Sequence, residues 1–420
     1  MSEAPGTPWL VGEDAARAWV AIDDAAAALA ALPREALLGE PTLAGGSAGL
    51  ALFFAYLAGA QEGRGHEDHA GRFLEWAQDD VAEGRIPFGA GLYQGFTGVA
   101  WVVEHITGDP QDAIDEHMAT YLRRSPWLED YDLITGLCGF AIWALEALPR
   151  PGAVECLRLV CERLVECARP VPGGSGIQWW TPPHLLPTHQ REVFPGGYEN
   201  FGLAHGFPAV IGVLAQAVAS GALDEPLRAR TLATARAGVE RLFAVRRTSG
   251  LSRYPTTIDE RNLFDDSRLA WCYGDPGVGA ALTVASQVLD EPSWRSEAEA
   301  IALACARRDV KTAGVVDAGI CHGSAGLSLM YRRFHERFGH AELGAAATYW
   351  AQRTLDFRRP PSEFFSGWSA YSPEGYRTAR EWLTGATGIA MTLLAAVTGI
   401  APDWDRTLLL SACPAALGAR

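Results

Sequence analysis

The chain has 420 residues, 48% hydrophobic and 20% charged, a composition typical of a globular protein and not of a disordered one. Its 35 Lys and Arg residues against 50 Asp and Glu residues give a net charge of −15, without the basic cluster that nucleic acid phosphates require. We therefore expect no nucleic-acid partner. Eight cysteines are too few for a disulfide framework, so a cysteine with a function is expected to be a ligand or a nucleophile.

The first residues, MSEAPGTPWLVGEDAARAW, are acidic and lack the basic and then apolar layout of a secretion signal. The most apolar late stretch, 388–401, is shorter than the roughly 18 to 20 residues that a membrane-spanning helix needs. We therefore expect a cytoplasmic protein with no transmembrane segment.

A short glycine element recurs along the chain, each time followed by an apolar, Ala-rich run. The first glycines are separated by 49, 41, 70, 68, 49 and 62 residues, and the fourth element has Ala209 in place of the second glycine. The seven elements are Gly46-Ser-Ala-Gly49, Gly95-Phe-Thr-Gly98, Gly136-Leu-Cys-Gly139, Gly206-Phe-Pro-Ala209, Gly274-Asp-Pro-Gly277, Gly323-Ser-Ala-Gly326 and Gly385-Ala-Thr-Gly388. Seven repeats nearly fill the chain.

Each repeat has room for a small-residue helix after the glycines and for a second helix, such as 70–84 or 225–245. Because strand-like alternation is almost absent, the sequence predicts an all-α fold. The helices after the glycines are apolar nearly all round, which favours an inner ring of helices inside an outer ring, an α/α toroid with about seven helices in each. We expect residues 1–420 to form this one domain, interrupted at 170–200 by a Pro-, Gly- and aromatic-rich insertion.

The glycines suggest how the inner helices meet. Glycine at each helix start would let backbones crowd near the axis of the ring, where a Cβ would clash. The unpaired N–H groups of the helix starts would then face one shared pocket.

The residue immediately before each first glycine is polar or titratable in six of the seven repeats. These seven residues are Gly45, Gln94, Thr135, His205, Tyr273, His322 and Thr384. The position two before the glycine holds a cysteine in two consecutive repeats, Cys272 and Cys321. If the repeats close around an axis, Cys272, Cys321 and His322 converge into a site suited to one zinc ion per chain. No fourth protein ligand is evident, and three ligands with an open fourth position are the pattern of a catalytic zinc site.

Four further residues lie close to the glycine elements. His205 is a candidate general acid or base, or a helix-start histidine bonded to backbone. Asp132 either orients His205 and holds charge or caps a helix. Arg268 pairs with Asp132 or a substrate carboxyl, or is a surface arginine. Tyr273 donates a hydrogen bond into the cavity or simply packs.

Two other groups have structural interpretations. His66 and His69 lie in a polar stretch that is expected to be a solvated loop. Cys156, Cys161 and Cys167 recur on a predicted outer helix, where packing explains them best.

Together WCYGDPG, CHGSAG, GLAHGF, YDLITGL and LTGATGIA resemble the lanthionine synthetase C-like family, the lanthipeptide cyclases, over roughly residues 40–400. The resemblance implies an α/α toroid with a central zinc ion at Cys272, Cys321 and His322. It places the family's catalytic His and Asp at His205 and Asp132, and its Arg and Tyr at Arg268 and Tyr273. The insertion before His205 resembles a β-containing extension suggested to help hold the peptide.

For such a cyclase, zinc would lower the pKa of a substrate cysteine thiol, and the thiolate would add to a dehydroalanine or dehydrobutyrine. His205 would protonate the resulting enolate, while His205 and Asp132 both remain candidates for removing the thiol proton. The partners would be a dehydrated precursor peptide with its leader and a separate dehydratase, with a transporter complex as a further candidate. The alternatives are a relative that joins glutathione to dehydrated residues and a zinc-bearing peptide-binding scaffold without catalysis.

Overall fold

The computed structural model describes residues 6–85, 89–261 and 265–418, so the first five residues of the acidic N-terminal stretch lie outside it. The chain divides into two compact units. The first unit comprises Met1–Gly108 and Asp309–Asp405, and the second comprises Asp109–Arg308 and Arg406–Arg420. That the whole chain forms one domain stays a prediction.

The first unit consists of helices and one hairpin. Its elements are α1 (Gly12–Ala30), η1 (Arg34–Ala36), α2 (Ser47–Ala60), α3 (His66–Ala82), α4 (Phe96–Thr107), η3 (Val310–Thr312), α13 (Ser324–Phe338), α14 (Ala341–Phe357), the antiparallel strands β6 (Ser369–Ser372) and β7 (Gly375–Thr378), and α15 (Ala386–Thr398). The 3₁₀ turn η4 (Asp403–Leu408) follows where the chain passes into the second unit.

The second unit is helical apart from a few very short strands. Its helices are α5 (Asp112–Leu122), α6 (Leu137–Glu146), α7 (Pro151–Cys167), η2 (Pro183–Leu185), α8 (Thr188–Val193), α9 (Phe207–Ala219), α10 (Glu225–Val245), α11 (Asp275–Val288), α12 (Pro292–Ala306) and α16 (Pro414–Leu417). Its strands are β1 (Arg169–Pro170), β2 (Ile177–Gln178), β3 (Trp180–Thr181), β4 (Tyr198–Asn200) and β5 (Thr257–Ile258). No helix in the described part of the chain has both the length and the apolar character needed to cross a membrane.

A helix follows every glycine element, as predicted. These helices are α2, α4, α6, α9, α11, α13 and α15, and each begins at the residue after the first glycine. The second glycine therefore lies inside the first turn. Their residues are mostly buried on all sides; in α9 the whole run from Phe207 to Val218 is buried.

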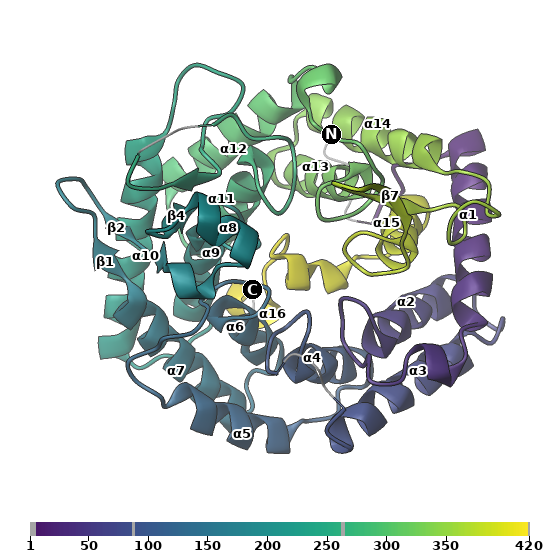
Figure 1. The fold of residues 1–420 in the computed structure, drawn as a ribbon, viewed down its shortest axis with the longest axis horizontal. Coiled ribbons are helices and arrows are strands. Elements are labelled where there is room, and N and C mark those ends of the chain that lie inside the picture. Colours follow the sequence, from purple (N-terminus) through teal and green to yellow (C-terminus); the bar gives the residue numbers. More distant parts are fainter. Residues whose placement is uncertain (1–5, 86–88, 262–264, 419–420) are drawn as a thin grey trace. The chain divides into compact units, whose positions relative to one another are not determined.

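Most of these helices pack against the helix that follows them in the chain. The pairs are α2 with α3 and α13 with α14 in the first unit, and α6 with α7, α9 with α10 and α11 with α12 in the second. Figure 1 shows the long helix α10 beside α9. The predicted segment 225–245 coincides with α10, and Cys156 and Cys161 are buried in α7.

The last glycine helix, α15, has a partner from the other end of the chain. It packs against α1, and the N–H groups of Trp9 and Leu10 donate to the carbonyl oxygen of Ala396 at 2.9 and 3.1 Å. The indole Nε1 of Trp9 donates to the Ser328 hydroxyl of α13 at 3.1 Å. The N-terminal helix thus completes the packing of a helix more than 350 residues away.

Backbone hydrogen bonds link the loops that precede neighbouring glycine helices. In the first unit the N–H of Ala44 donates to Tyr93 O at 2.8 Å, and that of Cys321 donates to Leu383 O at 2.8 Å. In the second unit the N–H of Ala204 donates to Cys272 O at 3.3 Å. All six residues lie two before a first glycine, so within each unit the repeats meet in register at this position.

The expectation that helix-start N–H groups face a shared pocket is wrong for several of these helices. The first N–H groups of α6, from Leu137, Cys138 and Gly139, donate to the carbonyl oxygens seven residues earlier, at Asp130, Tyr131 and Asp132. The starts of α2, α13 and α15 make bonds of the same kind. Each loop folds back on its helix start and satisfies the donors that the helix leaves unpaired.

The same fold-back explains the glycines. A Cβ built on Gly326 would lie 1.9 Å from the carbonyl oxygen of Ile320, which is six residues earlier in the same loop. The crowding that requires glycine therefore includes the repeat's own loop and is not confined to a meeting of neighbouring helix backbones.

The stretch containing His66 and His69 is not a solvated loop, as the sequence suggested, but the first turn of α3. Both rings contact Phe54, with centroids 6.0 and 5.1 Å away. Glu67 and Asp68 in this turn complement the helix dipole, and Gly65 precedes it with φ 77°. Burial lowers the pKa of both histidines, consistent with packing and not with solvent exposure.

Candidate active site

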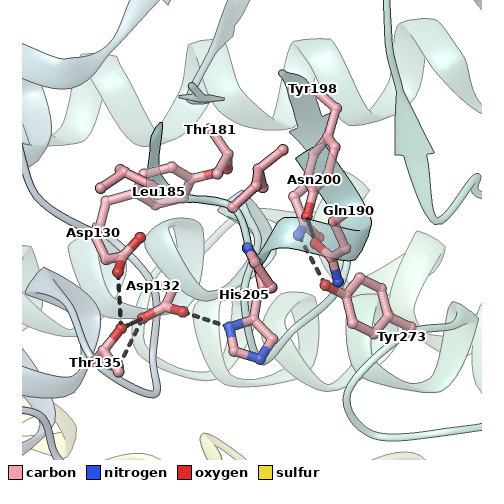
Figure 2. Close-up of a pocket in the computed structure, with 13 residues that line it drawn as sticks. Asp130, Asp132, Thr135, Thr181, Leu185, Gln190, Tyr198, Asn200, His205 and Tyr273 are labelled. Carbon is pink, nitrogen blue, oxygen red and sulfur yellow. Dashed lines mark hydrogen bonds and ion pairs between the residues drawn. The ribbon is translucent and has the colours of Figure 1, made fainter. Parts of the chain in front are cut away.

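A cavity of about 170 Å³ opens in the second unit beside the starts of α6 and α9 (Figure 2). It brings three of the predicted site residues together, namely Asp132, His205 and Tyr273. Its remaining lining residues are Asp130, Tyr131, Thr135, Thr181, Leu185, Leu186, Pro187, Gln190, Tyr198 and Asn200.

The predicted insertion supplies one wall of this cavity. Thr181 belongs to β3, Leu185 to η2 and Gln190 to α8, all inside 170–200. β4 pairs antiparallel with both β3 and β5 and places Tyr198 and Asn200 at the cavity. The short strands thus hold the insertion over the start of α9.

Asp132 is buried, 6% exposed, and its two carboxylate oxygens have different partners. Oδ1 accepts from the backbone N–H groups of Thr135 at 2.8 Å and Gly136 at 3.0 Å, just before α6. Oδ2 lies 2.5 Å from Nδ1 of His205 (Figure 2). The helix-capping and histidine-orienting interpretations of Asp132 are therefore compatible, because each uses one oxygen.

His205 sits between this carboxylate and the cavity, and its side chain is 45% exposed. Burial by itself would lower the pKa of His205, but the hydrogen bond and negative charge of Asp132 oppose it, and the net pKa is raised. With Nδ1 engaged by Asp132, Nε2 is the ring nitrogen left to meet a substrate. The arrangement suits a histidine that holds and delivers a proton.

Tyr273 faces the same cavity from the loop before α11. Its hydroxyl oxygen accepts from Nδ2 of Asn200 at 3.0 Å, and its ring centroid is 6.2 Å from that of His205. Burial raises the pKa of the Tyr273 phenol, so its hydroxyl keeps its proton and can donate into the cavity.

Arg268 is placed differently from the other predicted residues. It is half-buried and does not line the cavity. The partners of Asp132 among the described residues are Thr135, Gly136 and His205, so the anticipated pairing of Asp132 with Arg268 is absent from this part of the chain. Its role stays a prediction.

The three predicted zinc ligands lie in the loops before α11 and α13, and their role as ligands stays a prediction. In the second unit Cys272 is buried directly before Tyr273, and its carbonyl oxygen accepts from Ala204. In the first unit Cys321 and His322 are half-buried directly before Gly323 and helix α13.

An unpredicted carboxylate supports His322. Oδ2 of Asp317 lies 3.6 Å from Nε2 of His322 and accepts from the backbone N–H of Tyr371 in β6 at 3.0 Å. Burial would raise the pKa of Asp317, but the pairing with His322 and these hydrogen bonds lower it overall. Asp317 therefore carries charge beside His322 and orients the imidazole.

Three site residues that the sequence did not reveal, Asp130, Asn200 and Asp317, share one repeat position with the predicted Arg268. Asp130, Asn200, Arg268 and Asp317 each lie six residues before a first glycine. Asn200 contacts Tyr273, Asp317 contacts His322, and Asp130 contacts Thr135. Aligning this position, in addition to the two directly before the glycine, would have found them.

Comparisons with known proteins agree with this architecture. A model of the family described as lanthionine synthetase C-like protein matches residues 38–409. The nisin biosynthesis protein NisC of Lactococcus lactis subsp. lactis is 23% identical over 316 residues, 69% of this chain and 72% of that protein. The solved structure of nisin cyclase superposes with a TM-score of 0.72 at 20% identity, over 89% of this chain and 93% of the other. This likeness confirms the predicted fold class, and the family match shows that the chain belongs to the lanthionine synthetase C-like family.

Proposed function

We propose that this protein is a zinc-dependent lanthipeptide cyclase. It adds cysteine thiols of a dehydrated precursor peptide to dehydroalanine or dehydrobutyrine and so forms lanthionine or methyllanthionine rings. The observation that carries the proposal is the contact of His205 with Asp132 at the mouth of a cavity, in a chain of this family.

The proposed zinc ligands are Cys272, Cys321 and His322. Two thiolates and an imidazole are a donor set that zinc prefers, and a carboxylate on the second nitrogen of a histidine, as Asp317 provides, is the usual support of a metal ligand. Bound at these residues, zinc would supply a Lewis acid that lowers the pKa of a substrate thiol.

The chain's own residues account for the proton transfers and for binding. The substrate sulfur loses its proton and bonds to the β-carbon of the dehydro residue, while the carbon–carbon π electrons move toward the carbonyl. His205 then delivers a proton from Nε2 to the α-carbon, and Asp132 stabilises the imidazolium form beforehand. Tyr273, which lines the cavity, would donate a hydrogen bond to the carbonyl oxygen of the peptide. The S–H bond and the carbon–carbon π bond are replaced by one C–S and one C–H bond. The thiol proton passes to solvent and His205 regains a proton from solvent, so no by-product forms.

The insertion is the proposed contact for the peptide, because Leu185, Leu186 and Pro187 form an apolar part of the cavity wall. A separate dehydratase would supply the dehydro residues before the peptide reaches this chain. We further propose that the protein acts in the cytoplasm, where its cysteines stay reduced.

Metal content tests the proposal together with ring closure. Wild type should carry about one zinc per chain; Cys321→Ala should remain folded with the metal lost, and Cys167→Ala, at the end of α7, should keep it. With a synthetic peptide containing dehydroalanine and cysteine, ring closure removes the alkylatable thiol without changing the peptide mass. A folded wild type without zinc, or one that leaves the thiol intact, would contradict the proposal.

A further inference from the structure

Asp130 is a second carboxyl group at the His205 cavity, and it is held in place through its main chain. Its carbonyl oxygen accepts from Nε1 of Trp127 at 3.0 Å and from the N–H of Leu137 at 3.3 Å. Its side chain is half-buried and points toward Asp132 and Thr135 (Figure 2). The loop therefore places two carboxyl groups beside one histidine.

The Thr135 hydroxyl lies between the two carboxyl groups. Its Oγ1 is 3.2 Å from Oδ2 of Asp130 and 3.1 Å from Oδ1 of Asp132. A hydroxyl has one hydrogen, so it cannot donate to both carboxylates at once. Whether the Asp130 carboxyl group is protonated therefore determines whether the Thr135 hydroxyl can donate to Asp132.

Two arrangements satisfy this geometry. When Asp130 is charged, Thr135 donates to it, and Oδ1 of Asp132 keeps its two backbone donors. When Asp130 is neutral, its O–H donates to Thr135, and Thr135 donates to Oδ1 of Asp132. In this second arrangement Oδ1 gains a third donor and one negative charge disappears from the site. Both changes weaken the hold of Asp132 on the imidazolium form of His205.

The groups around Asp130 are mostly acidic or neutral. Asp132 and Glu129 come from its own loop, His205 from the loop before α9, Tyr198 from β4 and Tyr121 from α5. Burial and then the charge of Asp132 raise the pKa of Asp130 to about 6, against the lowering effects of Thr135 and His205. Asp130 is therefore neutral below about pH 6 and charged above it.

We propose that Asp130 is a positioning residue of this site, which acts through Thr135 and Asp132 to set how firmly His205 holds its proton. Charged Asp130 favours the protonated histidine, and neutral Asp130 favours release of the proton. Its repeat position supports the assignment, since Asn200 and Asp317 at the equivalent positions contact Tyr273 and His322. The inference rests on the proposed function only for the role of His205 as proton donor.

The experiment is an NMR titration of the His205 ring in the full-length protein, which needs no substrate. Asp130→Asn should lower the midpoint of His205 by about 0.5 to 1 pH unit, the size expected for one nearby charge partly screened by water. Asp130→Ala should lower it as well, although it loses the hydrogen bond that Asn can keep. Glu129→Gln is the matched control, because it removes an exposed charge one residue away that pairs with Arg124, and it should shift the midpoint much less than Asp130→Asn.

The wild type provides a measurement that does not depend on any variant folding. Its His205 resonance should show a second inflection near pH 6, where Asp130 titrates, and Asp130→Asn should abolish it. A single inflection in wild type, an unchanged midpoint in folded Asp130→Asn, or an equal shift in Glu129→Gln would overturn the inference. If the protein closes rings but Asp130 does not affect the titration of His205, only this inference is wrong. If Asp130 affects the titration of His205 but the protein closes no rings, only the proposed function is wrong.

Discussion

The loops before α2 and α9 make the same turn but differ in what they offer to a ligand. In both, a Cβ on the first glycine would strike the carbonyl oxygen six residues earlier, at 1.7 Å for Gly46 and Glu40 and at 2.3 Å for Gly206 and Asn200. The residue before the glycine is Gly45 in one loop and His205 in the other. The turn is made by the main chain, so the position before the glycine remains available for chemistry.

The difference teaches where this repeat can change without losing its fold. The glycines and the bonded carbonyl oxygens recur because they build the turn, whereas the side chains one and six residues before the first glycine vary from Gly45 and Glu40 to His205 and Asn200. Substitutions at the two kinds of position should therefore separate stability from activity.

The largest effect on activity is expected for His205→Ala. Loss of a positioned proton donor should slow ring closure by about 10² to 10⁴-fold, while thermal unfolding and zinc content remain those of wild type. The rate of thiol loss from a dehydroalanine peptide measures it, with the exposed His189→Ala on α8 as control. If His205→Ala instead loses its metal, the histidine is a ligand and the assigned role is wrong.

A substitution at a glycine that builds the turn is expected to lower the stability of the fold. Gly326→Ala places a Cβ 1.9 Å from a main-chain oxygen and should destabilise the fold by about 1 to 3 kcal/mol. Gly45→Ala is the matched control, because nothing lies within 4 Å of its Cβ. Thermal unfolding of the two variants compares them directly, and equal midpoints would show that the fold-back turn tolerates a side chain.

A smaller effect is expected from the position six before the glycine. Asp317→Asn should weaken zinc binding by about 10- to 100-fold, because the asparagine side chain cannot supply the charge that orients His322. Competition with a chromogenic chelator measures this, and Asp356→Asn removes a surface carboxylate of the same unit as control. Unchanged affinity would mean that Asp317 serves only its bonds to Gly319 and Tyr371.

Helix starts and outer helices could be predicted because glycine spacing and helical periodicity are local signals. They located the start of every glycine helix and the bounds of α10. His66 and His69 were misplaced because their polarity outweighed a short helix-start signal, namely Gly65 directly before the helix and the acidic Glu67 and Asp68 in its first turn. The strands of the second unit have two or three residues each, too few for alternation to show.

Site residues could be predicted only at positions that were compared between repeats by their distance from the first glycine. His205 and Asp132 were found from their distance to a glycine, and the contact between them is present. Asp130, Asn200 and Asp317 were missed because their importance depends on the fold-back of the loop, which brings residues six and seven positions apart into contact. The spacing of apolar residues along one helix gives no signal for such a turn.

The pairing of α1 with α15 also constrains how the chain folds while it is being synthesised. At about 5 to 20 residues per second, α15 leaves the ribosome roughly 20 to 70 seconds after α1 is complete. During that interval the apolar face of α1, with Ala18, Ile22, Ala25 and Leu29, lacks the helix that will cover it. Residues 109–308, which make up most of the second unit, are one continuous segment and are synthesised within that interval. The first unit cannot close until its second segment, 309–405, has been made, so α1 stays uncovered while most of the chain is synthesised.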